Sequence, residues 1–307
     1  MTRFILCLSL LVSLPLCGQQ PNAHFLPTFF ENQAFAHRGG YAFGPENTLE
    51  TILYNVGFGV RAFEVDVMLT KDGELVLFHD DSIQRVLSTT DTKRVSEMTL
   101  DELKQYKLRD QRFGDVSVTT LQELFDTLLV SLSEEVLSDF ILELDFKPHG
   151  EETAKGVKKL LEVVNREVEN HGENLYNYFF LSSFYPEVLK EIRKSNQQLV
   201  TAFSVNNSSD KHKLKGKLAV FFAPMIIRKT KTSIIEPNIC LISTRFVRKY
   251  HKKGIMINAW TANTKCEKEY LSQFSIAHTT NCPYDSCDTD PSDQVGKPKK
   301  WCKGCAK

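Results

Sequence analysis

The sequence predicts a TIM-type (β/α)8 barrel, on two observations. From residue 34 to residue 284, short apolar segments with strand composition alternate with amphipathic segments of helical period. This alternation is typical of a parallel sheet covered by helices. Nine segments have strand character, but the second and third are separated only by Thr70-Lys71-Asp72-Gly73. So short a connection cannot make a parallel crossover and suits a β-hairpin, so eight strands remain for the ring.

The expected strands share short length and a high content of apolar or β-branched residues. They are residues 34–40, 62–69, 74–80, 140–146, 178–184, 199–205, 218–224, 257–263 and 274–280. Segment 74–80 forms the hairpin with segment 62–69 and is therefore left out of the ring.

Segments with helical period lie between most of these strands. The first begins at Asn47, where Glu50 three residues later completes a capping-box pattern. The other helices are expected within residues 98–106, 119–129, 151–170, 185–195 and 243–254.

Composition limits the classes of function. The chain has 307 residues, 42% of them hydrophobic, with 38 basic and 38 acidic side chains. That apolar content suffices for a globular core. Zero net charge argues against a nucleic-acid-binding protein, which usually carries a basic excess. No obligate protein partner is evident from the sequence.

The first 18 residues have the pattern of a signal peptide. Arg3 precedes an apolar run over residues 4–16, which is too short to span a bilayer. We therefore expect a secreted or extracytoplasmic protein. The segment around Cys17 is only faintly similar to a bacterial lipobox, and lipid anchoring at this cysteine stays open.

The segment 285–307 is expected to be a cysteine-containing tail appended to a barrel that spans residues 34–284. Beyond the signal the chain has six cysteines, and the last four have the spacing C-x4-C-x14-C-x2-C. An exported protein favours disulfides, although this spacing also resembles a zinc ribbon. The six are Cys240, Cys266, Cys282, Cys287, Cys302 and Cys305.

Acidic residues stand in two of the expected strands. If the hairpin turns on Lys71-Asp72, Glu64 lies opposite His79 and Asp66 lies opposite Leu77. Glu64 and Asp66 are two residues apart, so they share one face of the strand. The strand is otherwise apolar, and two carboxylates on a buried strand need a cation.

The strand 140–146 repeats this pattern, with Glu143, Asp145 and Lys147 on one side. The carboxyl ends of barrel strands are where barrel active sites are built. Oxygen ligands from several strands suit a hard cation, Mg²⁺ or Ca²⁺.

The opening stretch AHRGGYAFGPENT lies at the carboxyl end of the first strand. Arg38 offers a planar fork that matches phosphate oxygens, and the glycines would let the backbone approach a ligand. His37 and His79 could divide proton donation and removal between them.

These residues carry a family resemblance. HRGG…PENT and EVDVMLTKDGELVLFHD resemble the glycerophosphodiester phosphodiesterase family, and TTLQELFD, LSSF and AWTAN are similar to its later blocks. The resemblance runs from about residue 35 to residue 283. It implies a β/α barrel, a bound divalent cation, and hydrolysis of glycerophosphodiesters to glycerol 3-phosphate and an alcohol.

The resemblance also implies roles for the residues at matching positions. These are acid–base catalysis for His37 and His79, phosphate binding for Arg38 and Lys147, and cation binding for Glu64, Asp66 and Asp145. Asp145 stands where the family usually has Glu, and Glu143 is the alternative third ligand.

Three further positions are interpreted with the resemblance in hand. Glu46 and Asn47 are expected to organise the loop and helix cap. Trp260 is expected to line the glycerol or leaving-group pocket, with a packed barrel aromatic as the alternative. Asn281 replaces the usual Asp, and we expect this to affect the loop more than the chemistry.

The sequence thus favours a secreted, metal-dependent phosphodiesterase. Its expected path has a neighbouring substrate hydroxyl attack phosphorus, after which water opens the cyclic phosphate. The partner would be a small phosphodiester. The alternatives are a lysophospholipase D acting on lysophospholipids, and an inactive barrel used as a binding or cell-surface protein.

Overall fold

The fold is taken from a computed structural model that describes residues 30–206 and 213–284. Its main sheet has nine strands in the order β1-β11-β10-β9-β8-β7-β6-β2-β3, and β1 also pairs with β2, which closes the ring. The ring strands are β1 (Ala34–Ala36), β2 (Ala62–Leu69), β6 (Ile141–Phe146), β7 (Phe179–Ser183), β8 (Thr201–Val205), β9 (Ile234–Pro237), β10 (Met256–Ala259) and β11 (Ala277–Thr280). All neighbours in the ring are parallel, so the predicted (β/α)8 barrel is confirmed.

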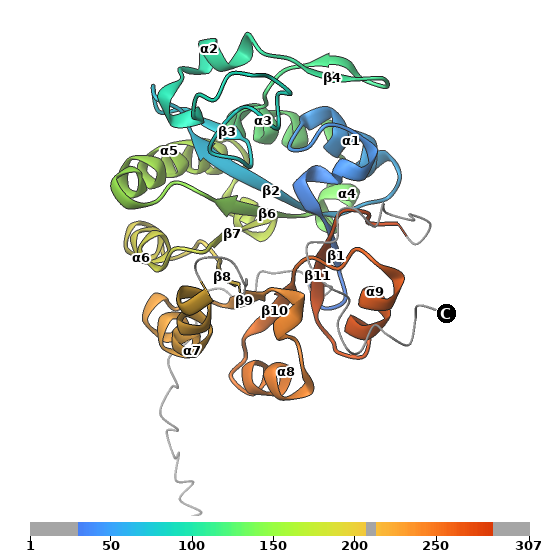
Figure 1. Ribbon diagram of the computed structural model, residues 1–307, viewed down its shortest axis with the longest axis vertical. Coiled ribbons are helices and arrows are strands. Elements are labelled where there is room, and N and C mark those ends of the chain that lie inside the picture. The colour runs from blue at the N-terminus through green and yellow to red at the C-terminus, as the bar shows by residue number, and fades with distance from the viewer. Residues whose placement is uncertain (1–29, 207–212, 285–307) are drawn as a thin grey trace, which may run out of the picture.

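Helices surround the ring (Figure 1). They are α1 (Leu49–Gly57), α3 (Leu121–Ser131), α4 (Glu134–Ser138), α5 (Thr153–His171), α6 (Pro186–Ser195), α7 (Lys213–Thr230), α8 (Thr244–His251) and α9 (Lys265–Leu271). Within the described residues, no helix combines the length and apolar character needed to cross a bilayer.

Several predictions concern residues outside the described ranges. The signal at 1–18, Cys17 and the tail at 285–307 are among them, together with three of its cysteines, Cys287, Cys302 and Cys305. The export signal, the lipid anchor and the choice between disulfides and zinc therefore stay predictions.

The inside of the barrel changes from apolar to polar along the strands. Side chains from β1, β6, β7 and β9 pack there as an apolar layer that includes Phe35, Ile141, Phe180 and Ile234. Two residues further along these and neighbouring strands the inward side chains are polar. They are Glu143, Ser182, Ser204, Glu236, Asn258 and Thr279. The polar end is the carboxyl end of the strands, where barrel sites form.

The hairpin after the second ring strand is present, but its predicted register is wrong by one residue. β3 (Leu75–Leu77) pairs with β2 so that Val67 lies opposite Leu77. The turn contains an additional residue because Gly73 adopts φ +95, which makes a three-residue loop rather than one centred on Lys71-Asp72. Phe78, not Leu77, therefore lies level with Asp66, its N–H donating to the Asp66 carbonyl at 3.0 Å.

One predicted ring strand is wrong and another was missed. Residues 218–224 lie within α7, and the ring position belongs to β9, whose four residues are all buried. The run LAVFFAP has strand-like composition, but in the helix Phe221 and Phe222 are exposed rather than in the core. The short segment Ile234–Pro237 carries too few apolar residues to show a period.

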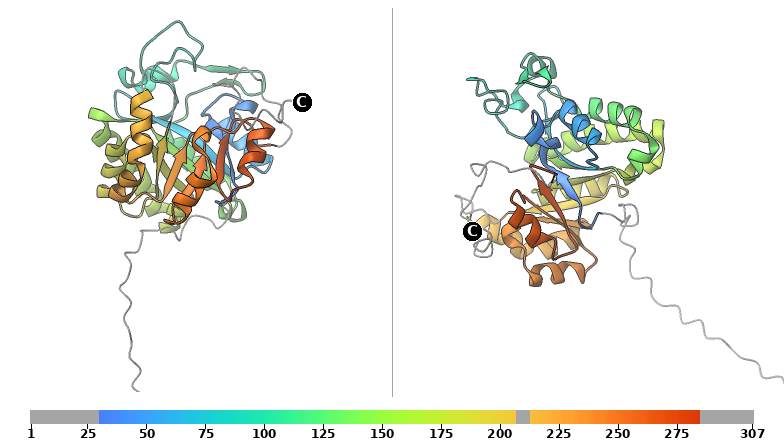
Figure 2. Two further views of the ribbon diagram at one scale, coloured as in Figure 1. Left: turned by 60° about the horizontal axis from the view of Figure 1, so that its bottom comes forward. Right: turned by 90° about the vertical axis from the view of Figure 1, so that its right-hand side faces the viewer.

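A long excursion separates β3 from α3. It contains α2 (Leu100–Lys104) and a small antiparallel pair, β4 (Leu108–Asp110) with β5 (Gly114–Val116). Figure 2 shows it standing out beyond the ring of helices. It has its own apolar cluster, which includes Phe78 and Met98.

Candidate active site

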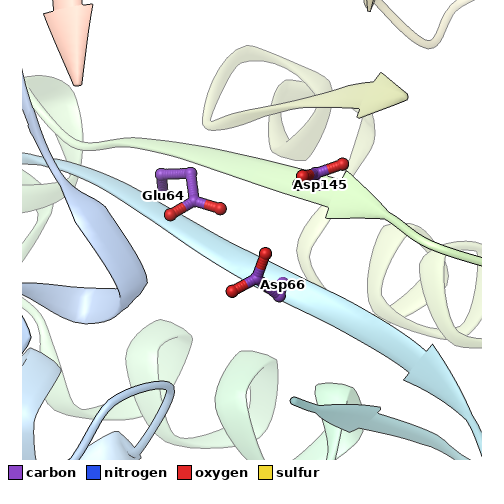
Figure 3. Close-up of side chains that lie close together, drawn as sticks. All are labelled: Glu64, Asp66 and Asp145. Carbon is purple, nitrogen blue, oxygen red and sulfur yellow. The ribbon is translucent and has the colours of Figure 1, made fainter. Parts of the chain in front are cut away.

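Three buried carboxylates meet at the polar end of the barrel. Glu64 and Asp66 lie on β2, and Asp145 lies on the adjacent strand β6 (Figure 3). Each offers an oxygen within 4.8 Å of the others. The parallel register of β2 and β6 places Asp66 directly beside Asp145, which explains the contact between residues far apart in sequence.

Lys147 neutralises part of this acidic cluster. Its Nζ lies 2.8 Å from an Asp66 oxygen and 2.5 Å from an Asp145 oxygen. Burial by itself raises the pKa of Asp66, but the charges of Lys147, His79, Arg38 and His37 together outweigh it and the net pKa is lowered. Burial raises the pKa of Glu64 well above its ordinary value, and repulsion by Asp66 and Asp145 adds to this. The cluster thus holds more negative charge than its lysine compensates.

Arg38 joins the cluster through both its backbone and its side chain. Its N–H donates to Glu64 Oε2 at 2.8 Å, and its Nε lies 3.8 Å from Asp66 Oδ2. The residue adopts φ +53, a left-handed conformation that is strained for a side chain this large. The Arg38 guanidinium group is therefore positioned by the backbone as well as by charge. It lies where a phosphate oxygen could bind.

The two glycines after Arg38 do not open space for a ligand, contrary to expectation. Gly39 and Gly40 adopt φ +78 and +87, and an added Cβ would lie 2.8 Å from Ile52 and 2.7 Å from Asn55. Both neighbours belong to α1. The glycines are needed because the chain turns sharply while packed against this helix.

His37 is held by the residue that departs from the family pattern. His37 Nδ1 lies 2.7 Å from Asn281 Oδ1, while Asn281 Nδ2 donates to the Tyr41 hydroxyl at 2.6 Å. The amide therefore accepts from the ring, and His37 Nε2 is left 3.9 Å from Glu64. Burial, followed by the nearby Arg38 charge, lowers the pKa of His37 to about 4. Asn281 thus contacts a candidate catalytic ring as well as the loop, and its expected minor role in the chemistry stays a prediction.

His79 reaches the same end of the barrel from beyond β3. Its Nδ1 lies 2.5 Å from Asp80, whose other oxygen accepts from Arg85 at 2.6 Å. Arg85 also binds Glu46 at 2.7 Å, and Glu46 contacts Arg38 at 3.2 Å. A continuous chain of polar contacts thus links the second histidine to the arginine.

Asn47 contacts the cluster directly instead of capping a helix. Thr48, not Asn47, caps α1 through the Thr51 N–H. Asn47 adopts φ +57, and its amide donates to Asp66 Oδ2 at 2.8 Å and accepts from the Asp66 N–H at 3.0 Å. The PENT block therefore positions a carboxylate of the site. Asn adopts a left-handed φ more readily than most residues do, so an Asn in this turn was the available sequence signal.

Glu143 lies level with Glu64 and deeper in the barrel than Asp66 and Asp145. It accepts hydrogen bonds from Ser182 at 2.9 Å and Asn258 at 2.8 Å, inside the polar layer of the barrel. Asn258 also contacts Glu236 at 3.4 Å. Both oxygens of Glu143 are thus engaged, whereas Asp145 Oδ1 is buried with no hydrogen-bond partner among the described residues.

Trp260 follows the end of β10 and is partly exposed. Its Nε1 donates to the Glu236 carbonyl at 2.9 Å, and Phe184 packs edge-on against its ring at 5.5 Å between centroids. Phe184 is itself 36% exposed. The Trp260 ring is packed on one side and partly exposed to solvent on the other. Its position is therefore compatible with lining a pocket and with packing as a barrel aromatic.

The donor set fits a divalent cation. Three buried carboxylates with mutually close oxygens, one of them unpartnered, are hard oxygen ligands. A buried acidic triad of this kind could hold a metal ion. Without an ion, burial and then repulsion by Asp66 and Asp145 raise the pKa of Glu64, so this carboxyl takes up a proton more readily.

The carboxyl end of the barrel brings acidic and basic side chains together at one site. An anionic ester needs cationic groups, and Arg38 and Lys147 are there beside an acidic cluster and two histidines. A β/α barrel arranged in this way suits an enzyme that hydrolyses phosphate esters.

Comparison with known proteins makes the assignment specific. The model of the Glycerophosphoryl diester phosphodiesterase family matches residues 37–279. The chain belongs to this family and is a phosphoric diester hydrolase.

Curated relatives agree over most of the chain. Glycerophosphodiester phosphodiesterase 1 of Bos taurus is 29% identical over 279 residues, covering 83% of this chain and 79% of the relative. The Mus musculus protein of the same name is 26% identical with the same coverage.

Solved structures share the fold. A putative glycerophosphoryl diester phosphodiesterase from Silicibacter pomeroyi aligns with a TM-score of 0.69 at 22% identity, over 82% of this chain and 91% of that one. An Oleispira antarctica phosphodiesterase, solved with the product sn-glycerol-3-phosphate, aligns with a TM-score of 0.67 at 20% identity over 83% and 94%.

Proposed function

We propose that this protein is a secreted, divalent-cation-dependent hydrolase that converts glycerophosphodiesters to glycerol 3-phosphate and an alcohol. The observation that carries the proposal is the acidic triad of Glu64, Asp66 and Asp145, with oxygens within 4.8 Å, beside Lys147 and Arg38. The named relatives and the product bound to the Oleispira antarctica enzyme support the substrate class.

The three carboxylates are the proposed ligands of a Ca²⁺ or Mg²⁺ ion. When bound, the ion supplies charge neutralisation at the phosphate oxygens. Arg38 and Lys147 add cationic donors for the same phosphate. Lys147 already contacts two of the carboxylates, so it can reach a phosphate oxygen held next to them.

Proton transfer is assigned to His37 and His79. In the first step the substrate's neighbouring hydroxyl attacks phosphorus and loses its proton to one histidine, while the other protonates the departing alcohol. In the second step water opens the cyclic phosphate with the two roles exchanged. Asn281 and Asp80 hold the Nδ1 sides of the two rings, which leaves each Nε2 for the reaction.

The test is a substrate panel of glycerophosphodiesters assayed for release of glycerol 3-phosphate, with added Ca²⁺ or Mg²⁺ and with chelator. His37→Ala and His79→Ala should each lower kcat by about 10²–10⁴-fold. His251→Ala, at an exposed position on α8, is the matched control and should keep wild-type turnover. Absence of any release by the wild-type protein with either cation would instead support the inactive-barrel alternative.

A lysophospholipid substrate is the second candidate, because Phe184 and Trp260 give the chain a partly exposed aromatic pair at 5.5 Å. Including lysophosphatidylcholine in the panel separates the two candidates. A higher kcat/KM for the lysolipid than for glycerophosphocholine would favour the hypothesis of a lysophospholipase D.

A further inference from the structure

The outer face of α7 carries large apolar side chains in solvent. Phe221, Phe222 and Met225 are 74%, 42% and 40% exposed. The two phenylalanine rings pack only edge-on against each other, with centroids 5.0 Å apart. Figures 1 and 2 show α7 on the outside of the barrel. No part of the function proposed above uses this face.

The exposure follows from the helical period. Ala223, Ile227 and Thr230 are buried on the side of α7 that faces the barrel. Phe221, Phe222 and Met225 fall on the opposite side, since residues three and four apart share a helix face. Two neighbouring phenylalanines and a methionine on one exposed face are a contiguous patch, which marks an interaction site more often than scattered apolar residues do.

The helix that carries this patch is basic in sequence. Between residues 213 and 231 the chain has six basic and no acidic residues, although the whole chain has 38 of each sign. Three of the six, Arg228, Lys229 and Lys231, follow the patch and have exposed side chains. Arg228 and Lys229 are exposed one turn beyond Met225.

We propose that this face of α7 binds the surface of an anionic lipid bilayer, with Phe221 and Phe222 inserted among the lipids. Basic residues around an exposed aromatic patch are the pattern of a helix that lies in the membrane interface. A second copy of this chain fits the face poorly, because it would bring Arg228, Lys229 and Lys231 of both copies together.

The position of α7 relates this contact to the active site. The helix follows β8, so its first turn begins at the carboxyl end of the barrel strands, the end that holds the acidic triad. Bound along the membrane by α7, the barrel would open its mouth beside lipid headgroups. This consequence rests on the proposed function, whereas the binding itself does not.

The test is cosedimentation of the purified protein with vesicles of phosphatidylcholine containing phosphatidylserine, and with vesicles of phosphatidylcholine alone. We expect binding to the anionic vesicles that weakens as salt is raised. The double variant Phe221→Ser/Phe222→Ser should lose roughly tenfold or more in partitioning. Val130→Ser on α3, at a position 80% exposed, is the matched control and should bind as wild type.

A charge-reversal variant, Arg228→Glu/Lys229→Glu, provides an independent readout that leaves the apolar patch intact. It should weaken binding to anionic vesicles and leave the far-UV circular dichroism unchanged. His37→Ala should bind vesicles as wild type does, so failure of catalysis and failure of membrane binding are distinguishable.

Three results would overturn the proposal. One is wild-type protein remaining in the supernatant with anionic vesicles at low salt. Another is a double variant that sediments as well as wild type. The third is a concentration-dependent dimer, abolished by the double variant, in a protein that binds no vesicles, which would assign the face to a second copy.

Discussion

Replacing Asp145 by Asn is expected to weaken cation binding strongly without unfolding the barrel. The oxygens of the triad lie within 4.8 Å of one another, so at an effective dielectric constant of about 20 each ionised pair repels by on the order of 3 kcal/mol. The substitution removes two of these three pairs. Lys147 keeps its contact with Asp66 at 2.8 Å, so its ammonium group does not become a buried unpaired charge.

The same substitution that relieves repulsion among the carboxylates weakens cation binding. Loss of one of three ligand charges should raise the cation Kd by about 100-fold, or about 2.7 kcal/mol. At a cation concentration of about 100 times the wild-type Kd, linkage stabilises wild type by about 2.7 kcal/mol and the variant by about 0.4 kcal/mol. With about 2–4 °C of Tm per kcal/mol in a domain of this size, the cation should raise wild-type Tm by roughly 5–10 °C. The variant should shift by only about 1 °C.

The assay is thermal unfolding of Asp145→Asn and of its matched control Glu143→Gln, each with and without Ca²⁺ or Mg²⁺. Glu143 lies two residues earlier on the same strand and is equally inaccessible, but its oxygens are engaged by Ser182 and Asn258. Glu143→Gln should therefore keep the cation-dependent shift. If Glu143→Gln loses the shift and Asp145→Asn keeps it, the third ligand is Glu143, and the phosphate role of Lys147 is wrong as well.

Three further outcomes are expected. His278, whose pKa burial lowers to about 4 from 6.5, takes up its proton only when unfolded between these pH values, so stability falls as pH drops through this window. Between pH 7 and pH 5 the unfolding free energy of His278→Gln should fall by about 2 kcal/mol less than that of wild type. Urea unfolding measures this difference, and an equal fall in both proteins would contradict the prediction. Asn281→Leu should lower kcat by about 10–100-fold because His37 loses its partner, whereas Asn281→Asp, which keeps an acceptor, should retain most activity. Asn47→Gly allows the left-handed φ but removes two hydrogen bonds to Asp66, so it should cost about 1–3 kcal/mol in unfolding free energy; an unchanged denaturation midpoint would refute this.

The sequence alone determined the barrel and the composition of its acidic cluster. Alternating strand and helix patterns require a parallel sheet, and the short Thr70–Gly73 connection allows only a hairpin. The spacing of Glu64 and Asp66 fixes them to one strand face, because side chains alternate at every residue. These are local properties, and local patterns are what a sequence shows directly.

Tertiary structure decided which distant residues meet. No periodicity in the sequence places Asn281 on His37, 244 residues away, because that contact exists only where the last strand closes the ring on the first. A separate long-range pairing, that of β2 with β6, brings Asp145 beside Asp66.

Two errors of the sequence reasoning have the same cause. Apolar composition cannot distinguish a buried strand from a surface helix, and the phenylalanines of α7 were taken for a core strand while the four-residue β9 was missed. The hairpin register depends on Gly73, whose positive φ adds one residue to the loop. Chain direction, face and contact across the barrel depend on where each element packs, and packing is a property of the whole fold rather than of any one segment.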